Sequence, residues 1–178
     1  MPRPPFLTHR VLPMPEGGVL PRFHVPWCFG CGPDNKHGLG LQARLEGDRV
    51  VADLHLASHF EGGPGVAHGG ALAAFMDDLM GFVPVAHAAP AVTARLEIEF
   101  RRPVLLEGTL QAEAWLCDRD GRKMWAEGIA RDAGGQVFVE SRALYLTVGL
   151  EHFAAAVAGM PEEMLERLTR FRPGEYYP

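Results

Sequence analysis

Two adjacent carboxylates, Asp77 and Asp78, interrupt a segment that is otherwise apolar. Apart from them, residues 71–83 carry only apolar side chains or glycine. A carboxylate is costly to desolvate unless it is paired or takes part in a reaction. The segment predicts a helix over residues 69–83 that ends at Pro84, and this helix is too apolar on all sides to lie on a surface. We therefore expect one of the two acids to do chemistry.

The predicted helix is preceded by His68 and begins with Gly69 and Gly70, which suits a reaction at a carbonyl group. The first N–H groups of a helix have no intrahelical partners and lie at the positive end of its dipole, and glycine lets a substrate approach closely. We expect the amides of Gly69 and Gly70 to polarise a carbonyl as an oxyanion hole, and His68 to help to position the substrate. The alternative is a tight turn that His68 anchors by hydrogen bonds.

Asp77 is the better candidate for the reacting acid, as a general base for water or as a nucleophile. Its apolar neighbours on the helix are expected to raise its pKa by desolvation. Thr93 is a candidate to hydrogen-bond to this carboxylate or to the attacking water, although the alternation of its strand places it on the polar face. Asp78 is offset by about 100° around the helix. It is expected to contact the substrate or, alternatively, to pair structurally with an arginine.

Composition excludes several classes of partner. The chain has 178 residues, a net charge of −5 and a pI near 5.9. A mildly acidic chain without clustered Lys and Arg is not expected to bind nucleic acid or an anionic membrane. No apolar stretch is expected to reach the roughly 18 residues of a spanning helix, and the first residues lack the apolar region of a signal peptide. The three cysteines do not form a disulfide framework, so a cytoplasmic protein is expected.

Changes in composition along the chain predict three regions. Repeated prolines in residues 1–27 favour an extended arm, and residues 28–150 are expected to form one globular domain. Residues 151–178 are expected to form a helical tail, because acids precede apolar residues at helical spacing there.

Alternating apolar and polar residues predict strands on both sides of the helix. Residues 39–56 predict a hairpin that turns at Gly47 and Asp48, and the glycine-rich residues 61–65 predict a loop. After the helix, an antiparallel meander of four strands is expected within residues 92–101, 110–116, 123–131 and 136–148. Together, the hairpin, the helix and the meander predict an α+β fold in which a six-stranded antiparallel sheet wraps around a long, central, apolar helix.

Cys28 and Cys31 form a Cys-x-x-Cys pair that allows three interpretations. They could be a redox pair, or half of a zinc site with His24 and His37 as partners. No second Cys-x-x-Cys and no βαβ context accompanies them, so a structural or unused pair of thiols is favoured and no metal is predicted. No serine lies in a Gly-x-Ser-x-Gly elbow, which argues against an α/β-hydrolase.

Several of these motifs recur in one known family. Residues 63–70 (Gly-Pro-Gly-Val-Ala-His-Gly-Gly) lead into the helix, and Asp77 follows nine residues after the histidine. Residues 28–35 with Gly38-Leu39 precede the first predicted strand, and Thr93 begins the first strand after the helix. In this order and spacing, residues 28–148 resemble the hotdog-fold acyl-CoA thioesterases of the PaaI-like group.

The resemblance implies a function and an assembly. It implies that the substrate is an acyl-CoA and that no cofactor is needed beyond the coenzyme A of this substrate. It also implies a homodimer or homotetramer, in which the acid of one subunit faces the helix N-terminus of another. Arg101 and Arg102 are candidates to contact the phosphates of coenzyme A. Two alternatives remain open: a binder of acyl-CoA without turnover, in which Glu61-Gly62-Gly63 replaces a water-positioning amide, and a hydratase or dehydratase that uses His87 with the acid.

Overall fold

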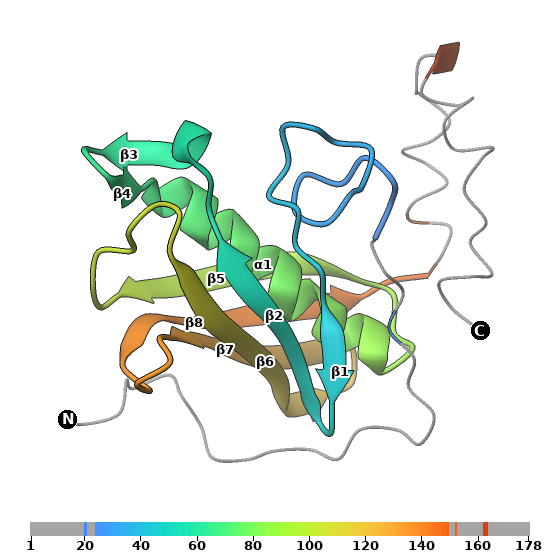
Figure 1. The fold of residues 1–178 in the computed structure, drawn as a ribbon. Helices are drawn as coiled ribbons and strands as arrows, with labels where there is room; N and C mark the ends of the chain where they lie inside the picture. The colour runs from blue at the N-terminus through green and yellow to red at the C-terminus, as the bar shows by residue number, and fades with distance from the viewer. Residues whose placement is uncertain (1–19, 21–23, 150–151, 153–161, 164–178) are drawn as a thin grey trace.

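A long helix packs against one face of a six-stranded antiparallel sheet (Figure 1). The computed structural model describes residues 20, 24–149, 152 and 162–163. The predicted arm and tail therefore fall almost entirely outside the described residues. The strands of the sheet are β1 (Arg44–Glu46), β2 (Arg49–His55), β5 (Ala91–Phe100), β6 (Thr109–Asp120), β7 (Lys123–Arg131) and β8 (Val137–Thr147). The predicted α+β architecture is confirmed.

The neighbours of one strand differ from the prediction. The order across the sheet is β1-β2-β6-β7-β8-β5, so only β6, β7 and β8 form a meander. Strand β5 pairs with β8 and forms the far edge, whereas β6 pairs with β2. Alternation predicts a strand but not its neighbour. Here the buried apolar residues of β2 lie directly opposite those of β6, in the pairs Val50 with Ala114, Ala52 with Ala112, and Leu54 with Leu110.

The segments before the helix also depart from the prediction. Residues 39–43 are not a strand, because the N–H groups of Leu39 and Leu41 donate to the carbonyls of Phe29 and Gly30 rather than to a neighbouring strand. The predicted loop contains a small hairpin of β3 (Glu61–Gly63) and β4 (Val66–Ala67), preceded by the short helix η1 (Ser58–Phe60).

Helix α1 (Gly69–Ala86) fills the concave face of the sheet. Phe75, Met76, Leu79 and Met80 are at most 1 % exposed. The backbone of β7 lies close to α1 at Gly128, where a Cβ atom would be 2.9 Å from the Met76 Cε atom. Glycine at this position lets the helix and the sheet meet.

The helix is longer than the sequence predicted. It continues for two residues past Pro84, which lies in the last turn and removes only one N–H donor there. With 18 residues and a mean hydropathy of 1.3, α1 is long and apolar enough to cross a membrane, so the prediction that no such stretch exists is wrong. Within the structure, however, 61 % of these 18 residues are buried, as expected of a core helix.

Candidate functional site

The carboxylate of Asp77 lies half-buried between α1 and the edge of the sheet. Thr93 of β5 donates a hydrogen bond from its Oγ1 to Asp77 Oδ1 at 3.0 Å. The hydroxyl of Tyr145 on β8 donates to the main-chain oxygen of Asp77 at 2.8 Å and lies 3.4 Å from Oδ1. Burial raises the pKa of Asp77, and the hydrogen bond from Thr93 opposes that rise. The predicted contact of Thr93 with the acid is present.

A β-bulge explains how Thr93 reaches the helix. Thr93 lies opposite Tyr145 and Arg95 lies opposite Leu144, so Ala94 is an extra residue in β5. An extra residue shifts the alternation of side chains by one position. Thr93 therefore shares the helix-facing side of the sheet with Leu96, whereas strict alternation predicted the opposite face.

At the start of α1, one of the two predicted backbone donors is already engaged. His68 is the N-cap residue, and its Nδ1 accepts a hydrogen bond from the N–H of Gly70 at 2.9 Å. This contact requires a proton-free Nδ1. Within the described residues, the N–H of Gly69 has no hydrogen-bond partner. Gly69 is thus the better placed of the two glycines to donate to a ligand.

A cavity of about 360 Å³ lies beside this helix terminus. Its lining includes Gly69, Phe100, Arg101 and Arg102, so the predicted helix terminus and both predicted arginines meet there. Arg101 already pairs with two glutamates. It donates to Glu140 Oε2 from Nε at 2.9 Å and from Nη2 at 2.8 Å, and it also forms an ion pair with Glu99. The hydrogen bonds to Glu140 raise the pKa of Arg101. No ion pair of Arg102 is found in the described part of the chain.

The two ends of the predicted site do not meet within one chain. Asp77 is eight residues along the helix from Gly69, which corresponds to about 12 Å of helix rise. His87 caps the other end of α1, ten residues beyond Asp77 and about 15 Å of rise away. The acid and histidine that a hydratase would need are therefore not paired on this helix.

Asp78 lies in a different environment from Asp77. Its Oδ1 is 3.0 Å from His24 Nδ1 and 3.3 Å from Cys28 Sγ. Cys31 Sγ is 3.5 Å from the same His24 nitrogen, and the ligand atoms of all four side chains lie within 4.8 Å of one another. His37, the other histidine considered from the sequence, is exposed and is not part of this group. We call these four residues the His-Cys-Cys-Asp cluster.

The groups of this cluster perturb one another. Burial lowers the pKa of His24, but hydrogen bonds to Asp78 and Cys28 outweigh it and raise the pKa to about 9. The hydrogen bond from Cys31 is the main cause that lowers the pKa of the Cys28 thiol to about 5, and the contact with His24 adds to it. The pKa of Cys31 rises because its thiol donates to Cys28 and because it is buried. Cys28 therefore has thiolate character.

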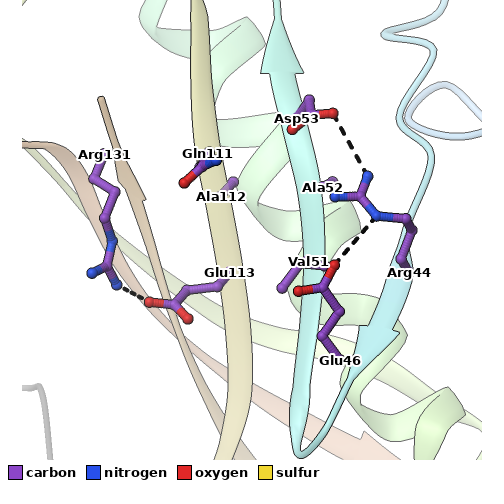
Figure 2. A pocket seen from close by; sticks show the side chains of 9 residues that line it. All are labelled: Arg44, Glu46, Val51, Ala52, Asp53, Gln111, Ala112, Glu113 and Arg131. Atoms are coloured by element: carbon purple, nitrogen blue, oxygen red, sulfur yellow. Dashed lines mark ion pairs between the residues drawn. The ribbon is translucent and has the colours of Figure 1, made fainter. Parts of the chain in front are cut away.

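A second cavity, of about 310 Å³, lies on the outer face of the sheet across β1, β2, β6 and β7 (Figure 2). Its charged side chains pair among themselves: Arg44 lies 3.6 Å from both Glu46 and Asp53, and Arg131 pairs with Glu113. None of the predicted site residues lines it. The arrangement is typical of a solvated sheet surface rather than of a reaction centre.

Two features of these sites were not predicted from the sequence. Alternation places Tyr145 in a strand and says nothing of its hydroxyl, although a tyrosine on the apolar face of a strand needs a hydrogen-bond partner. The proximity of Asp78 to Cys28 depends on how residues 24–41 fold over α1, and no local pattern records that contact.

Comparisons with known proteins agree with this architecture. Residues 64–139 match the family model of the thioesterase superfamily. The chain is 28 % identical over 121 residues to the acyl-coenzyme A thioesterase THEM4 of Mus musculus, in an alignment of 65 % of this chain and 52 % of that protein. The chain therefore spans about half the length of this curated relative.

Solved structures show the same fold. Protein RHA08564, a thioesterase superfamily protein, is 28 % identical with a TM-score of 0.64, over 81 % of this chain and 73 % of that one. The PaaI protein of the E. coli phenylacetic acid degradation operon is 19 % identical with a TM-score of 0.58, over 62 % and 81 %. A hypothetical thioesterase of Streptococcus pneumoniae TIGR4, solved with coenzyme A, is 17 % identical with a TM-score of 0.57, over 61 % and 86 %. The described residues thus have the hotdog fold of these structures, and residues 64–139 are similar to the thioesterase superfamily.

Proposed function

We propose that this protein hydrolyses an acyl-CoA, or a related acyl thioester, to the free acid and the thiol. The observation that carries the proposal is the Asp77 carboxylate. It is held by Thr93 and Tyr145 and lies half-buried on a helix whose buried side chains are apolar. A desolvated carboxylate beside a hydroxyl donor suits the removal of a proton from water.

In the proposed reaction, Asp77 takes a proton from water as the water oxygen bonds to the thioester carbonyl carbon. The negative charge moves to the carbonyl oxygen, where the N–H of Gly69 at the positive end of a helix stabilises it. When the intermediate collapses, the C–S bond breaks and the sulfur leaves as a thiol with the proton from Asp77. In the alternative route, Asp77 itself attacks the carbonyl carbon, the C–S bond breaks as the sulfur leaves, and water then hydrolyses the acylated Asp77 to the free acid. The acylated Asp77 would be found by mass spectrometry after rapid quenching.

The proposed site is completed by a second copy of the chain. Within the described residues, strand β5 pairs on one side only, with β8, and ten residues of unpaired edge favour the addition of another strand. Thr93 near one end of β5 touches Asp77, and Phe100 at the other end lies against Gly69. Antiparallel pairing of two β5 strands about a two-fold axis near their middle would bring Asp77 of one subunit toward Gly69 of the other.

The substrate class rests on the cavity beside Gly69 and on the relatives. Arg102 lines that cavity without an ion pair in the described chain, so it can contact a phosphate of coenzyme A. Arg101 is already neutralised by Glu140 and contributes less. Coenzyme A and acetyl-CoA are bound in two of the similar solved structures. Two further structures are of variants of the Streptococcus pneumoniae protein. One has alanine in place of an aspartate, and the other has alanine in place of a threonine sixteen positions later, which is the spacing of Asp77 and Thr93.

The test is a panel of acyl-CoAs of different chain length and aromaticity, with a thiol reagent to follow the release of CoA. Release of free thiol supports the proposal. Saturable binding by calorimetry without thiol release would identify a non-catalytic binder. Loss of the ultraviolet absorption of an enoyl thioester without thiol release would identify a hydratase.

Subunit mixing tests whether the site is shared. Asp77→Asn removes the acid, and Gly69→Val places a branched side chain against Phe100 at the helix terminus. Each variant alone is expected to be inactive, whereas mixed dimers contain one site with both groups intact. Partial recovery of activity on mixing supports the shared site, and no recovery from verified mixed dimers contradicts it.

A further inference from the structure

The His-Cys-Cys-Asp cluster is separate from the Asp77 contacts and has the composition of a transition-metal site. Its donors are one imidazole nitrogen, two sulfur atoms and one carboxylate oxygen. Thiolate and imidazole ligands in a four-donor set are typical of Zn²⁺. The spacing His-x₃-Cys-x₂-Cys supplies three donors from one short segment, and α1 supplies the fourth.

Three of the six distances between the donor atoms are close to those of a tetrahedral site, and the others are at most 4.8 Å. With Zn–S near 2.3 Å and Zn–N or Zn–O near 2.0–2.1 Å, adjacent ligand atoms lie about 3.3–3.8 Å apart. The observed separations are 3.0 Å from His24 Nδ1 to Asp78 Oδ1, 3.3 Å from Cys28 Sγ to Asp78 Oδ1, and 3.5 Å from Cys31 Sγ to His24 Nδ1. Small outward movements of these atoms would make room for the ion.

The surroundings hold the four donors in place. Cβ atoms at Gly30 and Gly32 would lie 2.2 Å from the Asp78 Cγ atom and from the Cys28 nitrogen, so only glycine allows this loop to close over the helix. The main-chain N–H of His24 donates to Cys31 Sγ at 3.1 Å, and the His24 ring stacks on Phe82 with centroids 4.1 Å apart. Hydrogen bonds to a ligand sulfur and a fixed imidazole plane are common supports of a metal site.

A buried oxygen without a hydrogen-bond partner favours a cation in this cluster. Cys31 is 5 % exposed, and the side chains of Asp78 and His24 are 12 % and 26 % exposed. The second oxygen of Asp78, Oδ2, is buried without a hydrogen-bond partner. A cation bound by Asp78 would satisfy this acceptor, which burial otherwise leaves without a partner.

We infer that His24 Nδ1, Cys28 Sγ, Cys31 Sγ and an oxygen of Asp78 bind one Zn²⁺ ion. All four positions are taken by protein, so the ion is structural rather than catalytic. It ties the segment that precedes β1 to the middle of α1, next to Asp77. The inference is independent of the proposed hydrolysis, because none of its tests measures thioester turnover.

The first test uses the wild-type full chain purified without chelators and under reducing conditions. Elemental analysis is expected to give about one zinc per chain. After removal of zinc, titration with Co²⁺ is expected to give the thiolate-to-cobalt and d–d absorption bands of a tetrahedral site, with an endpoint at one cobalt per chain. Absence of both zinc and these bands would overturn the inference, as would a Cys28–Cys31 disulfide in protein that holds no metal.

The second test uses variants. Cys28→Ser and Asp78→Asn are each expected to weaken zinc binding by at least about tenfold in competition with a chelator. His37→Ala is the matched control, because His37 is a nearby exposed histidine outside the cluster, and it should bind as the wild type does. Unchanged cobalt bands in Cys28→Ser would refute the assignment. Should that variant not fold, the titration of the wild-type chain decides the question.

Discussion

Replacement of Asp77 by asparagine separates catalysis from folding. Loss of a general base typically costs about 10²–10⁴-fold in rate, which corresponds to about 2.7–5.4 kcal/mol of transition-state stabilisation. The amide oxygen of the new side chain would still accept the hydrogen bond from Thr93, and Tyr145 donates chiefly to the main-chain oxygen at this position. We therefore expect kcat to fall by that factor while the structure is retained.

The effect of the same change on stability follows from burial. Burial raises the pKa of Asp77, so the ionised carboxylate disfavours the folded state above that pKa, and the penalty is relieved when the group is protonated. A neutral amide does not carry this penalty. The melting temperature of Asp77→Asn at neutral pH should thus equal or exceed that of the wild type, as is common when an active-site charge is removed.

The assay compares kcat for the best acyl-CoA of the panel with the melting temperature of each variant. Asp53→Asn is the control, because Asp53 is an exposed acid on the outer face of the sheet (Figure 2) and pairs with Arg44 only at 3.6 Å. It should change neither quantity. A rate for Asp77→Asn within about threefold of the wild type would refute the role of Asp77. A large fall in its melting temperature would show that the carboxylate holds the fold instead.

Three further substitutions test other parts of the structure. Thr93→Val removes a hydrogen bond to a carboxylate, worth about 1.5–3 kcal/mol, and should lower kcat/KM about ten- to hundredfold in the thiol-release assay; an unchanged value would exclude Thr93 from the reaction. Arg102→Ala should raise KM for acyl-CoA about two- to tenfold but leave KM unchanged for a short thioester without the nucleotide; equal effects on both would contradict a phosphate contact. Gly128→Ala places a Cβ atom 2.9 Å from a side chain of α1 and should destabilise the fold by about 1–3 kcal/mol, or about 2–12 °C in thermal denaturation. Gly63→Ala, which meets nothing within 4 Å, is its control, and equal melting temperatures would show that the helix can move aside.

The elements of the fold could be predicted because each depends on local chemistry. The strands show period-two alternation, and the histidine before α1 and the two glycines that begin it mark its first turn. The end of α1 was predicted less well, because Pro84 is tolerated in a last turn whose buried apolar residues hold it against the sheet. The place of β5 beside β8 was also missed, since strand pairing is decided by contacts between distant residues.

The candidate site shows the same division. The sequence alone singled out Asp77, since a carboxylate among apolar residues is conspicuous wherever the chain folds. It also placed His68, Gly69 and Gly70 at a helix terminus, because turn and cap chemistry is local. The N–H of Gly70 was predicted to be available to a substrate. Only the structure shows that His68 occupies it.

Tertiary structure alone decided which side chains meet. The bulge at Ala94 turns Thr93 toward Asp77, and Tyr145 arrives from a strand 68 residues away. Asp77 and Asp78 are adjacent in sequence, yet one faces the edge of the sheet and the other faces His24 and two cysteines. A helix turns by about 100° per residue, so neighbours along the chain point to different partners. Which partners these are depends on the packing of segments far apart in the sequence.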